Sequence, residues 1–436
     1  MLKINKRPFI TFSLITLISL PLFSQRNTYS PYSRYGLGEI QRTGFGQNEA
    51  MGGIAMGIRA NNHINYLNPA SYTSQDTMSF IFDFGIKVGN MYYKTNSTNY
   101  QTTNANLDHL AIGFPIAKWW KSSIGLVPFS TMGYYIKEGS SISTSYGNET
   151  SSKLVNYIYD GNGGLSQFYF GNAVEIGKHV SVGLNASYLF GRKESKRSIT
   201  FPYDNATPSS SIDENTTIGD FLFSFGTQFY GSLNEHVDYT VGAMLENNTE
   251  LNARQSIFAR NTMPIISNGQ QYTAVDTVLY TKGEQKTATY PTNLGIGLSL
   301  NFNKKILLGV DYYQQDWTNT TFMGHSDSLT NSNSIHAGLQ YTPDKTSISS
   351  YLDRINYRLG GYYSNTYLKL RGHQINEYGI SFGVGLPMPN SNTTFNFAFE
   401  LGQRGSLQDN LIKETFGRFK INFTLYDFWF FKRKFD

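Results

Sequence analysis

The side chains that most often carry out catalysis or hold metals are sparse in this chain and scattered along it. The sequence contains no cysteine, which excludes disulfides, thiolate zinc sites and cysteine nucleophiles. The histidines are His63, His109, His179, His236, His325, His336 and His373. None stands in a local signature with a serine nucleophile, and none has the spacing of a metal site. We therefore expect no enzyme activity, no metal and no cofactor.

The first residues have the layout of a secretory signal peptide. Lys3, Lys6 and Arg7 precede an apolar run from Phe9 to Leu20, and a short polar end follows Pro21. We expect a signal peptide over residues 1–24. The alternative is a membrane anchor, but the run is shorter than the roughly 20 residues that span a bilayer. Polar residues interrupt every later apolar run, so a membrane location would require a β-barrel.

The strongest pattern along the chain is a period of two. From Phe80 to Val88 the even positions are large and apolar, whereas the odd positions include Asp83, Gly85 and Lys87. Successive strand side chains point to opposite faces, so one face is apolar and the other small or charged. The pattern predicts about fourteen strands, near residues 76–88, 106–116, 121–130, 165–177, 179–191, 217–231, 236–250, 288–302, 304–318, 332–341, 355–364, 376–386, 393–404 and 413–426.

The connections between these strands alternate between long and short. The long ones include 131–164, 192–216, 251–287 and 319–331, and the connection 342–354 is an exception of middling length. Outer-membrane barrels have short periplasmic turns and longer outer loops, whereas a soluble β-sandwich has no reason to keep long loops on one side. We therefore expect an all-β, transmembrane antiparallel barrel in the outer membrane of a Gram-negative cell, with both mature termini periplasmic.

Charged residues within the strands identify the inner face of the barrel. A Lys or Arg on the lipid face at mid-membrane costs roughly 2–4 kcal/mol. The strand charges that fall on the less apolar face are Asp83, Lys87, Glu175, Asp238, Asp311, Arg358, Glu400 and Lys420. The formal net charge of +5 is too small for a chain of this length to suggest nucleic-acid binding.

Residues 25–75 form a separate N-terminal region before the barrel of residues 76–436. Its glycines disfavour a long helix, yet it carries too many apolar residues for a free polar tail. A barrel of about fourteen strands has an interior that must be filled or left as a channel. We expect this region to be a plug in the lumen, with Arg34, Glu39, Arg42 and Glu49 meeting the luminal charges.

Three motifs resemble the FadL/TodX family of outer-membrane transporters for hydrophobic compounds. Met51-Gly52-Gly53 followed by Asn68-Pro69-Ala70 is similar to that family's hatch. Tyr290-Pro291, the glycine-rich run 294–297, Asp311 and Trp317 resemble one of its strand pairs. The ending LYDFWFFKRKFD is similar to the Bacteroidota branch of the family, although many outer-membrane proteins end on an aromatic residue and this chain ends on Asp436.

The resemblance implies passive uptake of a hydrophobic small molecule, such as a long-chain fatty acid, with release sideways through the barrel wall. The implied hatch residues are Gly52, Gly53, Asn68, Pro69 and Ala70. The implied lateral gate is at Gly125, Pro128 and Gly133, because proline removes a ladder hydrogen bond. Pro128 could instead simply end its strand.

Apolar residues in the third long connection suggest a surface that captures the ligand. They are Ile257, Phe258, Met263, Ile265 and Ile266. The alternative is local packing within the loop.

A second function is compatible with the same fold. Some relatives of the family serve as accessory or shuttle barrels in type IX protein secretion and bind partner proteins with their outer loops. The expected partners are therefore a lipid-like small molecule and outer-membrane lipids, with the chain a monomer or bound to a partner protein. Co-purified lipid would favour transport, and a stable protein complex would favour the accessory role.

Overall fold

The computed structural model describes residues 28–41, 44–146, 149–204, 206–267, 270–324, 329–389 and 391–428. The signal peptide expected over residues 1–24 lies outside these ranges, as do Arg42 and His325. Within the described residues, no helix is long and apolar enough to cross a membrane.

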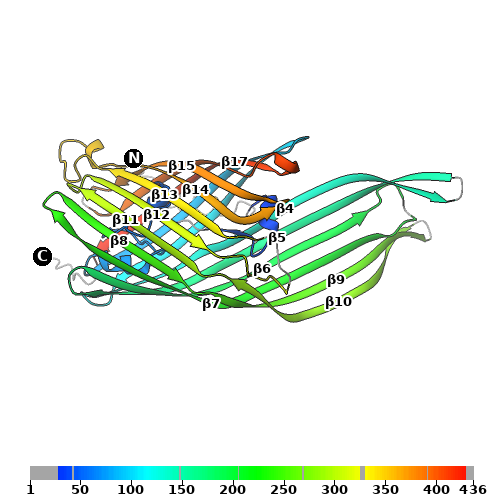
Figure 1. Ribbon diagram of the computed structural model, residues 1–436, viewed down its shortest axis with the longest axis horizontal. Coiled ribbons are helices and arrows are strands. Elements are labelled where there is room, and N and C mark those ends of the chain that lie inside the picture. The colour runs from blue at the N-terminus through cyan, green and yellow to red at the C-terminus, as the bar shows by residue number, and fades with distance from the viewer. Residues whose placement is uncertain are drawn as a thin grey trace, which may run out of the picture.

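Fourteen antiparallel barrel strands pair in sequence order around a closed ring (Figure 1), as the alternation predicts. Two of the fourteen are interrupted, so that β8 and β9 together form one barrel strand and β10 and β11 form another. The strands are β2 (Ser79–Lys94), β3 (Asn99–Pro115), β4 (Trp120–Tyr146), β5 (Glu149–Ile176), β6 (Val180–Thr200), β7 (Ser209–Asn234), β8 (Val237–Glu246), β9 (Thr249–Ser267), β10 (Gln270–Tyr290), β11 (Asn293–Phe302), β12 (Ile306–Gln315), β13 (Ser332–Tyr341), β14 (Asn356–Leu370), β15 (His373–Pro387), β16 (Thr394–Arg404) and β17 (Lys413–Phe428). Pro291 lies in the break between β10 and β11, where its missing N–H interrupts the ladder. The last strand pairs with β2 and closes the ring.

Short elements complete the chain. They are η1 (Pro31–Arg34), β1 (Glu39–Ile40), α2 (Gly46–Glu49), η2 (Pro69–Ser74), η3 (Leu352–Arg354) and η4 (Gln408–Asn410). The first four belong to the N-terminal region, and η3 and η4 lie in connections between barrel strands.

The two faces of the wall follow the predicted assignment. On β7, Phe221, Phe223 and Phe225 are exposed on the outside, whereas Ser224 and Gln228 are buried on the inside. The same parity buries Asp83 and Lys420 completely or nearly so. Bulky apolar residues therefore form the outer surface that meets lipid, and ions and small residues line the lumen.

Strands on one side of the barrel continue far beyond the membrane. A transmembrane strand needs about 9–11 residues, but β4 has 27 and β5 has 28. Together with β6, β7, β9 and β10 they form a long sheet that projects from the end opposite the short turns (Figure 1). We call this sheet the extension.

The predicted loops 131–164, 192–216 and 251–287 were wrong, because strands of the extension occupy most of each segment. Polar residues, above all serine and threonine, interrupt the apolar alternation in these segments, as in Ser140–Ser145. A reading based on apolar periodicity therefore misses them, although the serine, threonine and tyrosine they contain suit a solvated sheet. The connection 319–331 does lie between strands, in the segment that joins β12 to β13.

The described residues of the N-terminal region, 28–41 and 44–75, pack against inward-facing groups of the barrel wall. Met51, Ile54 and Met56 are fully buried against inward-facing wall residues. Asp311 accepts hydrogen bonds from the backbone N–H groups of Ala55, at 2.5 Å, and Met56, at 2.9 Å. The buried backbone of this irregular region is thereby satisfied by polar groups of the wall.

We expect Phe82→Arg to prevent assembly in lipid and Asp83→Asn to permit it. Phe82 lies on the outer face between Leu425 and Ile112, so arginine there would cost about 2–4 kcal/mol. Asp83 faces inward, and asparagine keeps its shape. Folding yield in lipid vesicles, measured by heat-dependent migration on gels, tests the pair. The opposite order would mean that the two faces are interchanged.

Candidate functional site

A cavity of about 230 Å³ lies in the lumen between the N-terminal region and the wall. One side is apolar and includes Phe129, Met244 and Tyr290. Phe129 and Tyr290 also belong to the apolar cluster at the base of the extension. The opposite side is formed by β15, β16 and β17 and carries Glu377, Glu400, Arg404 and Arg418. The cavity lining is therefore amphipathic, and Glu246 lies beside its apolar part, where it accepts a hydrogen bond of 2.9 Å from the Tyr290 hydroxyl.

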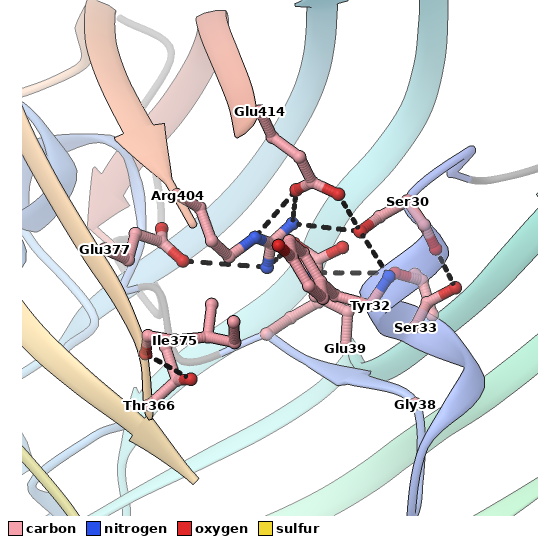
Figure 2. A network of polar contacts seen from close by, with 12 residues as sticks. Ser30, Tyr32, Ser33, Gly38, Glu39, Thr366, Ile375, Glu377, Arg404 and Glu414 are labelled. Atoms are coloured by element: carbon pink, nitrogen blue, oxygen red, sulfur yellow. Dashed lines mark hydrogen bonds and ion pairs between the residues drawn. The ribbon is translucent and has the colours of Figure 1, made fainter. Parts of the chain in front are cut away.

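Arg404 is the centre of the ionic wall (Figure 2). Its guanidinium lies 2.7 Å from a carboxylate oxygen of Glu414, 3.1 Å from Glu39 and 3.6 Å from Glu377. Glu414 also accepts a hydrogen bond of 2.6 Å from Ser30. Ser30 and Glu39 belong to the N-terminal region, so this cluster connects that region to β15, β16 and β17.

Arg418 lies four residues after Glu414 on β17, on the same face of the strand, and extends the cluster. It lies 3.3 Å from Glu400, 3.6 Å from Glu39 and 3.8 Å from Glu377. Tyr362 donates hydrogen bonds to both Glu377 and Glu400. Two guanidinium groups thus serve four carboxylates in a largely water-excluded place, where such pairs are strong only when fully hydrogen-bonded.

A second ionic cluster lies beside the first. Lys420 pairs with Glu49 of α2 and with Asp108 of β3 at 2.5 Å. The ring nitrogens of His109 lie 2.8 Å from Asp108 and 2.7 Å from Asp83. The imidazole ring therefore lies between two carboxylates. These groups form a closed set of ion pairs with no bound metal implied, and the described residues contain no group of three potential metal ligands.

Aromatic rings connect this cluster across the lumen. Phe45 stacks on His109 with the ring centroids 3.7 Å apart, and Tyr66 stacks on Phe45 at 5.1 Å. Tyr169 continues the series from the wall, 5.6 Å from Tyr66. Tyr66 also lines the cavity. The stack therefore closes part of the cavity on the side of the short turns.

The wall is not fully paired between β3 and β4. Their ladder covers six residue pairs, from Pro115 with Lys121 to Leu110 with Leu126. Beyond that point β3 continues to Asn99, but β4 bends inward and its free edge pairs with β1, at Ser130 and Thr131. A bulge between Pro128 and Ser130 in the ladder with β5 accompanies the bend.

A smaller hollow of about 60 Å³ lies where β3 and β4 separate. It is lined by Lys87 of β2, Leu107 and Asp108 of β3, and Val127 and Pro128 of β4, among others. The residues that line both this hollow and the central cavity are Glu39, Gln41, Tyr66 and Arg418. We call this hollow the side opening.

Gly52 and Gly53 of the expected hatch motif lie against the wall and also line the cavity. Gly52 has φ +71°, and a Cβ there would lie 2.6 Å from the backbone N of Gly361. Its N–H donates to Ser381 at 2.8 Å, and His336 donates from Nδ1 to its carbonyl at 2.6 Å. Only glycine fits both the backbone conformation and the approach.

The second half of the motif begins η2. The Asn68 side chain caps this helix by accepting from the N–H of Ala70 at 3.2 Å, and it donates to the Met56 carbonyl at 2.9 Å. Pro69 occupies the first helical position, where its fixed φ is suitable. A Cβ on Gly226 of β7 would lie 2.2 Å from Asn68 Oδ1. The motif therefore positions the N-terminal region against the wall and makes no contact with the cavity through these three residues.

The expected gate residues all lie on β4. Pro128 lines the side opening and stands at the bulge. Gly125 lies in the last part of the β3–β4 ladder, and a Cβ there would lie 2.5 Å from the ring of Tyr169. Gly133 lies beyond the bend, against the backbone of Thr28. Pro128 thus does not end its strand, which continues to Tyr146.

The expected capture residues lie on strand β9 of the extension, not in a loop. Ile257 and Met263 have the opposite parity to Phe258, so these three divide between the two faces of the sheet, and the side chains of Ile265 and Ile266 lie outside the described part of the chain. Phe258 packs edge-on against Tyr280, with the centroids 5.8 Å apart, and lies under Arg260. Local packing explains Phe258.

Sequence reasoning did not identify Arg404, Arg418, Glu377 and Glu414 as members of the site. The signal was present, because the even positions of β17 face inward and carry Glu414, Arg418 and Lys420 in one line. Their connection to Glu39 depends on the path of an irregular segment, which no periodicity describes.

We expect Arg404→Gln to loosen the N-terminal region while the barrel stays folded. Removing this cation leaves buried Glu414 and Glu39 partly uncompensated, which costs about 3–5 kcal/mol. Hydrogen exchange of residues 29–41 should become faster. Arg371→Gln, at an exposed turn, is the matched control. Equal exchange in both variants would show that Arg404 does not hold this region.

Comparisons with known proteins agree with this architecture. The CymD monoaromatic hydrocarbon channel has a TM-score of 0.54 at 12% identity, over 89% of this chain and 98% of the channel. The toluene transporter TbuX of Ralstonia pickettii gives 0.53 at 13% identity, over 88% and 98%. A FadL homologue of Pseudomonas aeruginosa gives 0.55 at 11% identity, over 90% and 100%. The expected FadL/TodX-like fold is confirmed, and at such identities the likeness concerns the fold alone.

Sequence comparisons give a more specific assignment. A search of curated proteins finds no match to this chain. The family model for BamG matches residues 4–436, which is nearly the full sequence. The chain therefore belongs to the BamG family, with the barrel fold of the FadL/TodX channels.

Proposed function

We propose that this protein is an outer-membrane channel that takes up a hydrophobic small molecule and releases it sideways into the membrane. The observation that supports this most directly is the separation of β3 from β4 next to a luminal cavity. The hydrocarbon and toluene channels of the same fold have names that describe such cargo.

The route has two parts. The aromatic side of the cavity, with Phe129 and Tyr290, suits the apolar part of a ligand. Gln41 and Tyr66 border both the cavity and the side opening, so a ligand in the cavity lies next to the gap in the wall. The stack of Tyr66, Phe45 and His109 obstructs the direct way toward the short turns. We therefore infer that a ligand leaves the cavity through the side opening rather than past this stack.

The N-terminal region acts as the hatch in this proposal. Gly52 and Gly53 line the cavity, and β1 occupies the inner edge of β4 beside the side opening. A shift of β1 would change the width of the gap. The fatty-acid-like ligand that the resemblance implies is less well supported, because carboxylates predominate among the charges around the cavity.

Cross-linking the side opening should slow uptake. The chain has no cysteine, so a Leu107→Cys, Pro128→Cys double variant offers one reactive pair, and both positions line the opening. A cleavable bismaleimide should lower uptake of the neutral dye 1-N-phenylnaphthylamine by intact cells toward that of cells lacking the protein. Reduction of the linker should restore it.

The control pair for that experiment is Ser334→Cys with Ser364→Cys. These residues face each other across the closed β13–β14 ladder and line the cavity away from the opening. Cross-linking them should leave the uptake rate unchanged. If the linker at the opening has no effect on uptake either, release does not pass between β3 and β4.

A second candidate function is an accessory role in which the extension binds a partner protein. The observation that favours it is the length of the projecting sheet, which exceeds what a membrane span needs. Its outer parts expose large apolar side chains, including Tyr135, Val278 and Tyr280. Exposed apolar groups on a solvated sheet are typical of an interaction surface.

Shortening the β4–β5 hairpin separates the two candidates. Ile136 and Tyr159 are ladder partners, so the strands between them can be replaced by an Asn-Gly turn. If the extension binds a protein, the shortened chain should lose partners that co-purify with the full chain in mild detergent. If transport is the only function, dye uptake and the set of co-purified proteins should both stay unchanged.

A further inference from the structure

We propose that the cavity selects ligands with a positively charged head and excludes carboxylates. This inference rests on the proposed function, namely that a small molecule with an apolar part occupies the cavity. It adds the charge of the ligand's polar end, which the charged side chains around the cavity determine.

The charged residues that line the cavity are predominantly acidic. Among the described residues, five carboxylates and two arginines border it. The carboxylates are Glu39, Glu49, Glu246, Glu377 and Glu400, and the arginines are Arg404 and Arg418. A ligand anion placed here adds to an existing excess of negative charge, whereas a cation reduces it.

The two arginines are already used by the protein's own carboxylates. Arg404 donates from Nε to Glu414 at 2.8 Å, and its other nitrogens lie next to Glu414, Glu39 and Glu377. Arg418 donates to Glu400 at 3.3 Å and lies near Glu39 and Glu377. A ligand carboxylate would have to displace one of these partners and leave it uncompensated. A fork of free N–H groups, the usual receptor for an anion, is absent from these two residues.

The charges behind the cavity do not reverse this balance. Lys420 is shared between Glu49 and Asp108. His109 lies between Asp108 and Asp83, and Lys87 donates to Gln41 at 3.0 Å. Lys420, Lys87 and His109 are matched in number by Asp83, Asp108 and Glu414, which do not line the cavity. The acidic excess therefore remains at the cavity surface.

The rest of the lining also suits a cationic head. Tyr66, Tyr290, Tyr313, Tyr362 and Tyr367 border the cavity. The faces of aromatic rings attract ammonium groups, and this attraction is stronger where water is excluded. An alkylated ammonium has no N–H groups that need acceptors, so it can rest on such rings beside carboxylates. Phe129 and Met244 provide the apolar contact for the remainder of the ligand.

Three water-soluble probes of matched size test the inference on the full chain in detergent. They are benzyltrimethylammonium, benzyl alcohol and phenylacetate, whose binding can be followed by saturation-transfer NMR and titration calorimetry. We expect the ammonium to bind about tenfold or more tightly than phenylacetate, with the alcohol between them. Glu246→Gln and Glu377→Gln should each reduce this ratio, because each removes one carboxylate from the lining.

Glu235→Gln, at an exposed turn between β7 and β8, is the control and should leave the ratio unchanged. Phenylacetate binding as tightly as the ammonium would overturn the inference, since protons would then already neutralise the acidic excess. A preference for the ammonium that survives both lining variants would overturn it as well. If none of the three probes binds, the proposed transport function fails together with it.

Discussion

The structure depends on one constraint, which is that every backbone polar group within the bilayer needs a hydrogen-bond partner from the protein, because lipid supplies none. Each barrel strand therefore needs a partner on both edges. The ring meets this requirement along nearly all of its circumference, and β17 closes it against β2. A departure next to the luminal cavity is at β3 and β4, where the two separate after six pairs. There the edge of β4 turns inward and finds its partner in β1, a strand from the lumen.

This exchange of partners gives the N-terminal region a structural role beyond filling space. Its residues Glu39 and Ile40 pair with the edge of β4 at the bend, and the carboxylate of Glu39 forms ion pairs with Arg404 and Arg418. The position of β1 is thus coupled to the ion pairs of β16 and β17 on the far side of the cavity. A displacement at either place is transmitted to the other, because Glu39 belongs both to the β1–β4 pairing and to the ion-pair cluster.

Much of this fold follows from the sequence, and the reasons are local. Alternation along β2, β7 and β17 indicated the strands. The charges on the less apolar face identified the lumen, since a charge on the lipid face costs about 2–4 kcal/mol of stability. The extension was missed because polar residues interrupt the apolar alternation along much of its strands. The gap beside Pro128 could be suspected from a proline in a strand, but that β1 would pair with β4 there could not. Such pairing brings together residues about 90 positions apart through an irregular segment.

For the charges too, local sequence pattern indicates the face on which a residue lies, and only the folded chain shows which residues it meets. Parity alone places Glu414, Arg418 and Lys420 in the lumen, but only the folded chain shows that carboxylates outnumber cations at the cavity. Burying such an excess is unfavourable unless hydrogen bonds stabilise it, and Tyr362, Tyr290 and Asn293 of the wall, with Ser30 of the N-terminal region, donate to these carboxylates without supplying a positive charge. A site that evolved only to fill the lumen would be better stabilised by apolar residues or balanced pairs. The excess of carboxylates over cations at the cavity therefore fits the proposed binding surface, in which a cationic ligand would balance it.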